Sequence, residues 1–353
     1  MKITIPGLID PHVHMRVPGG EHKEDFDSGT CAALAGGYTT ILAMPNTKPP
    51  VMNAETLDLA LGMAARQARC DYGQYVGAGE INAAEAAACG LRAAGLKIYL
   101  DATFGDLKIQ NAEAWMDHFE RFPRERPIVV HAEQTSVPAI IQIAQLFDRS
   151  VHIAHVSRRE EILVIRKAKE RGLKVTCEVG PHHLFLCDED APRFGPGRCE
   201  VRPRLQTRRD QEALWANLEY VDCFATDHAP HLLSEKDGPN PPPGFPGLET
   251  ALAVLMLAVH DGRLTMEDII ARMHTNPQRI FGLPDQPNTF VEVDTDAEWV
   301  IRGGKQFTRC AWSPFDGLAV RGKVTRVVLR GADAFCEGVV LAAPGNGQNV
   351  RSE

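Results

Sequence analysis

Four features that would place this chain in a specialised class of protein are missing from its sequence. The nine cysteines contain no Cys-x-x-Cys pair and are odd in number, which is typical of reduced thiols in a cytosolic protein. The longest apolar run, residues 251–259, has about half the length of a membrane-spanning helix. No secretory signal opens the chain, and no short-period repeat runs through it. These absences exclude a disulfide-stapled miniprotein, a membrane protein and a fibrous repeat.

The chain also has fewer basic than acidic residues. Lys and Arg number 38 against 46 Asp and Glu, which gives a net charge of −8. We therefore expect no nucleic acid and no membrane surface among the partners, whereas a small anionic substrate stays compatible with this charge. With 44% apolar and 24% charged residues, the composition predicts a cytoplasmic globular protein with ample material for a core.

Short β-rich runs alternate with helical stretches over most of the chain. This alternation indicates βαβ units with parallel strands, and eight such runs predict a (β/α)8 TIM barrel. The expected strands are residues 7–14, 39–44, 72–77, 95–100, 127–131, 151–155, 174–178 and 221–226. Helices are expected between them, for example at residues 54–69, 112–121, 135–147 and 160–171.

The pattern changes near residue 288 to short β-like pieces. We predict an α/β fold in three parts: the barrel at residues 7–287, a small β-rich subdomain from residues 1–6 plus 288–343, and a loose tail at residues 344–353. The β-like pieces lie at residues 290–293, 299–302 and 323–330. Two Pro- and Gly-rich segments, 188–211 and 237–247, are expected to be active-site loops or surface linkers.

Two histidines close the first expected strand. His12 and His14 lie two residues apart on an extended segment, so both imidazoles point to the same face. At the carboxyl end of a barrel strand that face is the active site. Two imidazoles on one face form part of a zinc site, although a structural pair of histidines explains this feature equally well.

Other strand ends carry further metal-ligand types. His131 ends the fifth expected strand, His155 the sixth, Asp227 follows the eighth, and Lys97 lies in the fourth. Each is ordinary alone, since His155 could be a core histidine and Lys97 a surface lysine. Together they favour the site of a metal-dependent hydrolase. Arg16, two residues after His14, points into the same mouth, where its planar guanidinium could hold a carboxylate; an exposed strand-end arginine is the alternative.

These segments resemble the amidohydrolase superfamily and, within it, the dihydroorotases, most closely the dihydroorotase domains of multifunctional animal pyrimidine-synthesis proteins. The resemblance covers nearly the whole chain. It rests on HVHMR (12–16), AMPNT (43–47), GLKIYL (95–100), VVHAE (129–133), VHIAHV (151–156), PHHL (181–184), TDHAPH (226–231) and GFPGLET (244–250).

The resemblance implies two zinc ions. His12, His14 and Asp227 would hold one, and His131 and His155 the other. Lys97, as its N-carbamate, would bridge them. A lysine ammonium beside two dications would be repelled, whereas a carbamate supplies a shared anion.

The resemblance also implies the reaction, the reversible cyclisation of N-carbamoyl-L-aspartate to L-dihydroorotate, with Asp227 moving the proton. Thr103 and Phe104 match a flexible loop that closes over the substrate. The substrate-binding residues implied in this way are Arg16, Asn46, Arg202, His231, Pro243 and Gly244. Glu178, His182 and His183 lie near the site without a settled role.

One residue departs from the family pattern: Val17 stands where a glutamate usually follows the carboxylate-binding arginine, which puts the orientation of Arg16 in question. Two other functions stay open, a dihydropyrimidinase or hydantoinase and an inactive dihydroorotase-like scaffold. The full ligand set argues against the scaffold. A homodimer is the default assembly, and the short segment before Gly7 suggests either a compact homologue or a domain with carbamoyl-phosphate synthetase and aspartate transcarbamoylase domains as neighbours.

Overall fold

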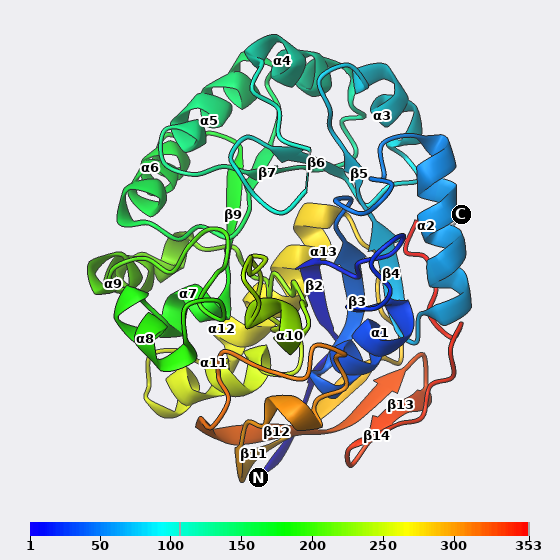
Figure 1. Ribbon diagram of the computed structural model, residues 1–353, viewed down its shortest axis with the longest axis vertical. Helices are drawn as coiled ribbons and strands as arrows, with labels where there is room; N and C mark the ends of the chain where they lie inside the picture. The colour runs from blue at the N-terminus through cyan, green and yellow to red at the C-terminus, as the bar shows by residue number, and fades with distance from the viewer. Residues whose placement is uncertain (106, 352–353) are drawn as a thin grey trace.

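The computed structural model describes residues 1–105 and 107–351; Asp106 of the predicted flexible loop and residues 352–353 of the predicted tail lie outside the described residues. A ring of parallel strands forms the centre of the molecule (Figure 1). Its members are β2 (Leu8–Val13), β3 (Tyr38–Ala43), β4 (Asp71–Gln74), β5 (Val76–Gly77), β6 (Leu96–Tyr99), β7 (Ile128–His131), β8 (Val151–Ile153), β9 (Val175–Val179) and β10 (Cys223–Phe224).

The ring is closed by hydrogen bonds. One sheet runs β10-β9-β8-β7-β6-β5 and the other β2-β3-β4, and β4 and β5 are two parts of one strand interrupted at Tyr75. The Tyr75 N–H donates to Ala43 at 2.9 Å, and the His14 N–H donates to the His228 carbonyl at 2.7 Å, which joins β2 to the segment after β10. The predicted (β/α)8 barrel is confirmed.

Eight helices follow the eight strands and cover the barrel, as the arc of α2 to α6 in Figure 1 shows. They are α1 (Phe26–Ala35), α2 (Ala54–Gln67), α3 (Ala83–Cys89), α4 (Ala112–Arg121), α5 (Ser136–Leu146), α6 (Arg159–Glu170), α9 (Arg208–Ala216) and α11 (Ala251–His260). Capping side chains fix their starts: Asn53 accepts from the Thr56 N–H before α2, and Thr207 from Asp210 before α9. In the described part of the chain, no helix has the length and apolar character that a membrane crossing requires.

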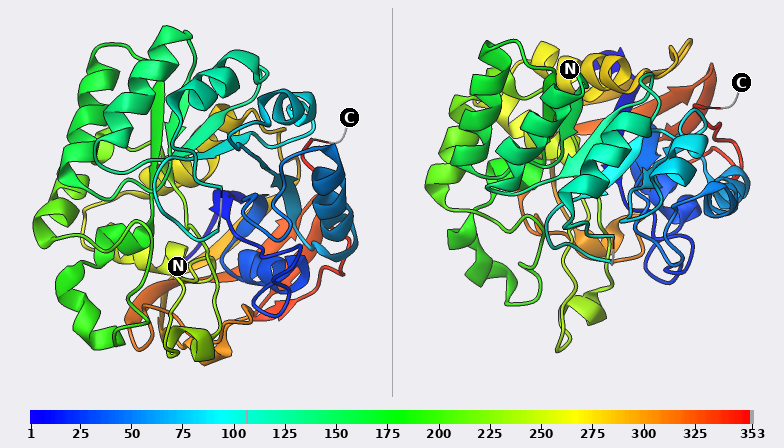
Figure 2. Two further views of the ribbon diagram at one scale, coloured as in Figure 1. Left: turned by 45° about the horizontal axis from the view of Figure 1, so that its top comes forward. Right: turned by 90° about the horizontal axis from the view of Figure 1, so that it is seen from above.

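Short helices occupy the two ends of the barrel. In the right view of Figure 2, the segment of α10 projects at one end and α13 lies at the other. The carboxyl-end loops contain α7 (Pro181–Phe185), η1 (Asp188–Asp190), α8 (Ala191–Phe194) and α10 (Leu233–Lys236). The remaining short helices are η2 (Leu218–Tyr220), α12 (Met266–Ile270), η3 (Ala271–Thr275), α13 (Asn276–Phe281) and η4 (Gly303–Lys305).

The barrel interior is apolar below the site. Phe281 of α13 enters from the amino end and packs its ring 5.1 Å from that of His152. Above it, the interior changes to the buried polar side chains described below, at the end of the barrel where the loops that follow the strands meet. The interior cluster includes Ile9, Leu42, Tyr75, Val129, Ala154, Cys223 and Phe281.

A second, antiparallel sheet lies beside the barrel, at the bottom of Figure 1. Its order is β1-β11-β12-β13-β14, and its strands are β1 (Lys2–Pro6), β11 (Phe290–Val300), β12 (Ala319–Leu329), β13 (Ala332–Cys336) and β14 (Val339–Val340). Two pieces predicted as separate strands, 290–293 and 299–302, belong mainly to the single strand β11, because an irregularity between Asp294 and Glu298 bends the strand without ending it. The boundaries 7–287 and 1–6 plus 288–343 stay a proposal.

The segment predicted to be a loose tail is docked on the barrel as far as Arg351. The Tyr72 N–H donates to the Gln348 carbonyl and the Val350 N–H to that of Tyr72, both at 2.9 Å, so the segment extends the edge of β4. Arg351 also donates to the Gly282 carbonyl at 2.7 Å. Composition alone concealed this pairing, because it is carried by backbone groups.

Candidate active site

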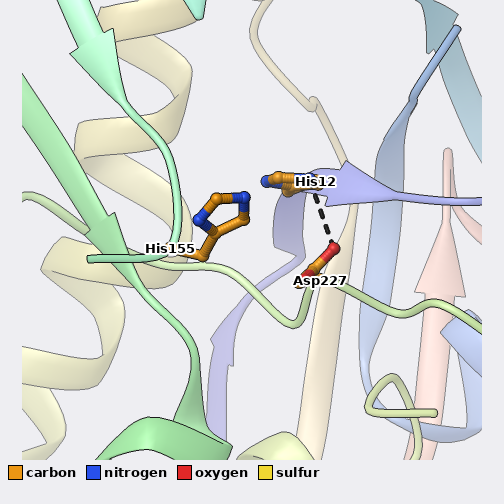
Figure 3. A group of neighbouring side chains, drawn as sticks. All are labelled: His12, His155 and Asp227. Carbon is orange, nitrogen blue, oxygen red and sulfur yellow. Dashed lines mark ion pairs between the residues drawn. The ribbon is translucent and has the colours of Figure 1, made fainter. Parts of the chain in front are cut away.

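Three predicted ligands meet at the carboxyl end of the barrel. His12 Nε2 lies 3.3 Å and His14 Nε2 3.1 Å from Asp227 Oδ1. Figure 3 shows His12 of β2 facing Asp227 and His155, which come from the loops after β10 and β8. Ligand atoms of His12, His155 and Asp227 all lie within 4.8 Å of one another. The spacing of two residues therefore turns both His12 and His14 toward one point.

The other two predicted histidines form a second group. β7 ends at His131, whereas β8 ends at Ile153, two residues before His155. His131 Nδ1 and His155 Nε2 lie 2.9 Å apart, and both rings are buried. Neutral imidazoles that turn ring nitrogens toward each other present lone pairs that a divalent cation accepts.

Lys97 of β6 lies beneath these groups. It is fully buried, and its Nζ has no hydrogen-bond partner within the described residues. Burial lowers the pKa of Lys97 to about 8, although Glu178 and Asp227 oppose the shift. A buried amine without a partner is costly, so its presence beside imidazole and carboxylate donors fits a site that holds divalent metal.

Glu178 of β9, left without a role by the sequence, orients His12. One carboxylate oxygen bonds His12 Nδ1, and the other lies 3.1 Å from His152 Nε2. Burial opposes ionisation, but His12 and His152 hold the pKa of Glu178 below its usual range. Because Nδ1 is occupied, His12 Nε2 is the nitrogen that faces the ligand cluster.

The backbone at the site is held in an unusual conformation. Arg16, His155 and Asp227 have φ values of 60°, 35° and 47°, in the left-handed region that non-glycine residues seldom adopt. Such conformations persist where surrounding contacts fix them, and they gather at functional sites. Asp10 provides one such contact, since it accepts from the Thr226 hydroxyl at 2.5 Å.

Arg16 is held without the acidic neighbour that the family usually provides. Its Nε donates to the Pro230 carbonyl at 3.0 Å, and its Nη2 lies 3.0 Å from His231 Nε2. Val17 is buried in the apolar core. Val17 put the orientation of Arg16 in question because it replaces the usual glutamate. In this structure the Pro230 carbonyl, rather than a carboxylate, holds the Arg16 guanidinium.

The segment predicted to be a flexible loop covers this side of the site, where Thr103 and Phe104 line the cavity. Asn46 joins the loop to a ligand: its Oδ1 accepts from His14 Nδ1 at 2.8 Å, and its Nδ2 donates to the Phe104 carbonyl at 2.8 Å. The Arg16 guanidinium carbon lies 5.1 Å from the centre of the Phe104 ring. Asn46 thus couples loop position to the orientation of His14.

The closed loop leaves a cavity of about 20 Å³, room for about one water molecule, so a larger ligand requires the loop to move. Two of the predicted site residues, Lys97 and His231, are not among the residues that line this cavity. Tyr99, missed by the sequence reasoning, lies two residues from Lys97 and so faces the same way; that spacing was the signal. The lining consists of His12, His14, Arg16, Asn46, Tyr99, Thr103, Phe104, His131, His155, Arg202, Asp227, Ala229, Pro243 and Gly244.

Comparisons with known proteins identify the family of this chain. A family model described as dihydro-orotase-like matches residues 1–117. The chain is 33% identical to the dihydroorotase of Pyrococcus furiosus, over 97% of this chain and 84% of that protein. The chain belongs to the dihydroorotase family. The resemblance to the dihydroorotases that the motifs predicted is confirmed.

Relatives of this dihydroorotase-family chain include parts of much longer proteins. It is 54% identical to the multifunctional protein CAD of Squalus acanthias over 99% of its length, but spans only 16% of that protein. Two solved structures share the fold: an L-hydantoinase from Arthrobacter aurescens (TM-score 0.92, 25% identity, 99% and 89% of the two chains) and an inactive dihydroorotase-like domain from Chaetomium thermophilum (TM-score 0.85, 30% identity, 99% of both).

Proposed function

We propose that this chain is a dihydroorotase that interconverts N-carbamoyl-L-aspartate and L-dihydroorotate in pyrimidine synthesis. The observation that carries the proposal is a buried guanidinium, that of Arg16, in the same cavity as the cluster of histidines and Asp227. Dihydroorotate carries a free carboxylate, which a fixed guanidinium binds strongly. His231 lies 3.0 Å from Arg16, and Asn46 lines the same cavity, so we assign both as further carboxylate contacts. Arg202, Pro243 and Gly244, which also line the cavity, are assigned to the urea side of the ring.

The proposed metal ligands follow the two groups of side chains. His12, His14 and Asp227 would hold one zinc ion and His131 and His155 the other, and carbamylated Lys97 would supply an anion shared by the two. The buried, unpartnered Nζ of Lys97 supports the last assignment. Bound there, zinc would activate water and polarise the ring carbonyl.

Asp227 moves the proton in the proposed mechanism. Burial alone would raise its pKa, but His12 and His14 outweigh burial and keep the pKa below its usual range. The ionised carboxylate accepts a proton from the attacking water and delivers it to the leaving ring nitrogen; ring closure runs the same transfers backward. Thr103 and Phe104 cover the reacting atoms while this happens.

The alternatives are weighed by particular residues. The likeness to L-hydantoinase would equally suit a dihydropyrimidinase or hydantoinase, but their substrates lack the carboxylate that Arg16 and Asn46 are placed to bind. The likeness to an inactive domain raises the scaffold alternative. This chain retains four histidines, Asp227 and Lys97 in one converging cluster, which favours an active enzyme.

Arg16→Ala should raise the KM for dihydroorotate and leave metal content unchanged. Loss of a buried charged partner for a carboxylate corresponds to about 30- to 1000-fold in kcat/KM. Steady-state kinetics with parallel metal analysis test this expectation. An unchanged kcat/KM would contradict a carboxylate-selective site.

Lys236→Met should lower the free energy of unfolding and raise the KM. The Lys236 ammonium is buried and donates to the carbonyls of Glu200 (2.6 Å), Pro242 (2.9 Å) and Gly244 (3.3 Å), which ties together the two loops that carry Arg202, Pro243 and Gly244. Leaving these acceptors unpaired should cost about 2–4 kcal/mol.

Urea denaturation and kinetics measure the two effects of the Lys236 variant. The control is Lys305→Met, because Lys305 is exposed and lines a different cavity, together with Trp299 and Val324. Equal stability and equal KM in the two variants would show that the buried ammonium does not hold the loops.

We also propose a cytoplasmic location, a homodimer, and neighbouring carbamoyl-phosphate synthetase and aspartate transcarbamoylase domains. The nine free cysteines support a reducing compartment. The match to a small part of CAD supports the neighbouring domains. Size-exclusion chromatography with light scattering tests the dimer.

A further inference from the structure

Lys23 contacts His231, a residue proposed to bind the substrate, at the Nδ1 atom of its ring. It lies in the loop between β2 and α1, and its side chain is only 13% exposed. Its Nζ is 3.2 Å from His231 Nδ1 and 2.9 Å from Glu235 Oε1. His231 is completely buried, so this ammonium is a fixed neighbour rather than a solvent-exposed one.

The two nitrogens of His231 have different surroundings. An ammonium only donates, so Nδ1 must accept from Lys23 and carries no proton. Nε2 lies 3.0 Å from the Pro243 carbonyl, which only accepts, so Nε2 must carry the proton. These two contacts select the same tautomer of the neutral ring. The Arg16 guanidinium, which also only donates and lies 3.0 Å from Nε2, opposes this choice.

The ring is neutral as well as fixed. Burial, together with the charges of Arg16, Lys23 and Lys236, lowers the pKa of His231 far below its usual range. The carboxylate of Glu235, which approaches Lys23 to 2.9 Å, is already paired with that ammonium. The choice at His231 is therefore between two neutral tautomers.

The selected tautomer leaves two donors side by side. Arg16 Nη2 lies 3.0 Å from His231 Nε2, and in this tautomer both atoms carry hydrogens. Two donors so close are poorly matched to each other but well matched to an anionic oxygen that accepts from both. With the other tautomer, Nε2 would accept from Arg16 and offer nothing to a carboxylate.

We propose that Lys23 is a positioning residue that fixes His231 as the Nε2–H tautomer, so that His231 and Arg16 donate together to the carboxylate of the substrate. The assignment rests on the proposed function for the identity of the ligand. For the tautomer itself the assignment rests on the contacts that His231 makes with Lys23 and with the Pro243 carbonyl in the free enzyme.

The kinetic test compares Lys23→Met with Lys48→Met in the zinc-loaded enzyme. Lys48 is exposed and lines the same outer cavity of about 610 Å³ as Lys23, so its loss removes an equal charge without the hydrogen bond. Lys23→Met should raise the KM for dihydroorotate about 5- to 30-fold with kcat nearly unchanged, the effect of one hydrogen bond to a charged group. Lys23→Arg, which retains a donor, should recover part of the loss. An equal rise in Lys48→Met would show a general charge effect and overturn the proposal.

Nitrogen-15 spectra of histidine-labelled enzyme give a readout that a structural role would not move. Signals of His231 are identified by their absence in His231→Gln. The wild type should show a protonated Nε2 and an unprotonated Nδ1, and Lys23→Met should shift the population toward the Nδ1–H form. Lys23 Nζ also lies 5.1 Å from the Phe104 ring centre, so a change in loop closure alone would alter kinetics but leave the tautomer unchanged.

The outcomes separate the two proposals. Wild-type enzyme that binds zinc but does not turn over dihydroorotate would end the proposed function and leave the tautomer assignment standing. Identical His231 tautomers in wild type and Lys23→Met would end the role of Lys23 and leave the function standing.

Discussion

Asp227→Asn is expected to abolish turnover in both directions while the barrel stays folded. The amide keeps the shape of the side chain but does not accept the proton that ring opening and ring closure both move. Loss of a general acid–base group alone corresponds to about 10²–10⁴-fold in rate, and weaker coordination by the amide adds to it. Initial rates with each substrate and far-ultraviolet circular dichroism test the expectation.

Metal analysis separates the two causes of that loss. Asp227 Oδ1 lies beside both His12 and His14, so the variant could lose zinc as well as the proton acceptor. A variant that retains zinc and loses activity isolates proton transfer. If the zinc-loaded variant kept a tenth of wild-type activity, another group would have to carry the proton.

Local spacing in the sequence predicted the directions in which side chains point. His12 and His14 lie two residues apart at the end of β2 and both line the cavity. Arg16 lines it too, although it lies beyond β2 in a left-handed backbone conformation. The same rule applied to Lys97 would have found Tyr99. These residues were accessible because period-two alternation depends only on neighbouring residues.

Contacts between distant segments were not accessible in this way. Glu178 bonds His12 from 166 residues away, and Arg16 is held by Pro230 across a separation of 214 residues. Backbone acceptors cannot be recognised from the pattern of side chains. The structure was therefore needed to show that the Pro230 carbonyl holds Arg16 and that residues 348–351 dock on the barrel. In the sequence, Lys23 and Lys236 cannot be distinguished from solvent-exposed loop lysines, because their contacts are made with distant segments.

Lys97→Ala is expected to lose most of the bound metal and essentially all activity without unfolding. Four neutral histidines and one carboxylate are too little negative charge to hold two dications close together, so a shared anion is needed. Lys97 is the residue placed to provide it, because its Nζ is buried with Glu178 and Asp227 as the charges acting on it. Removing an unpartnered buried amine leaves no hydrogen bond broken, so thermal stability should survive.

Lys236→Met provides the matched comparison for this variant. Lys236 is the other lysine among the fully buried large side chains, and its ammonium donates to the carbonyls of Glu200, Pro242 and Gly244, none of which is a predicted metal ligand. Its loss should leave zinc bound, whereas loss of Lys97 should not. Short carboxylic acids should restore some metal and activity to Lys97→Ala by taking the place of the carbamate. A crystal structure of active, fully zinc-loaded enzyme that shows an unmodified lysine at residue 97 would refute the bridging role, because the two cations would then be held together by other means.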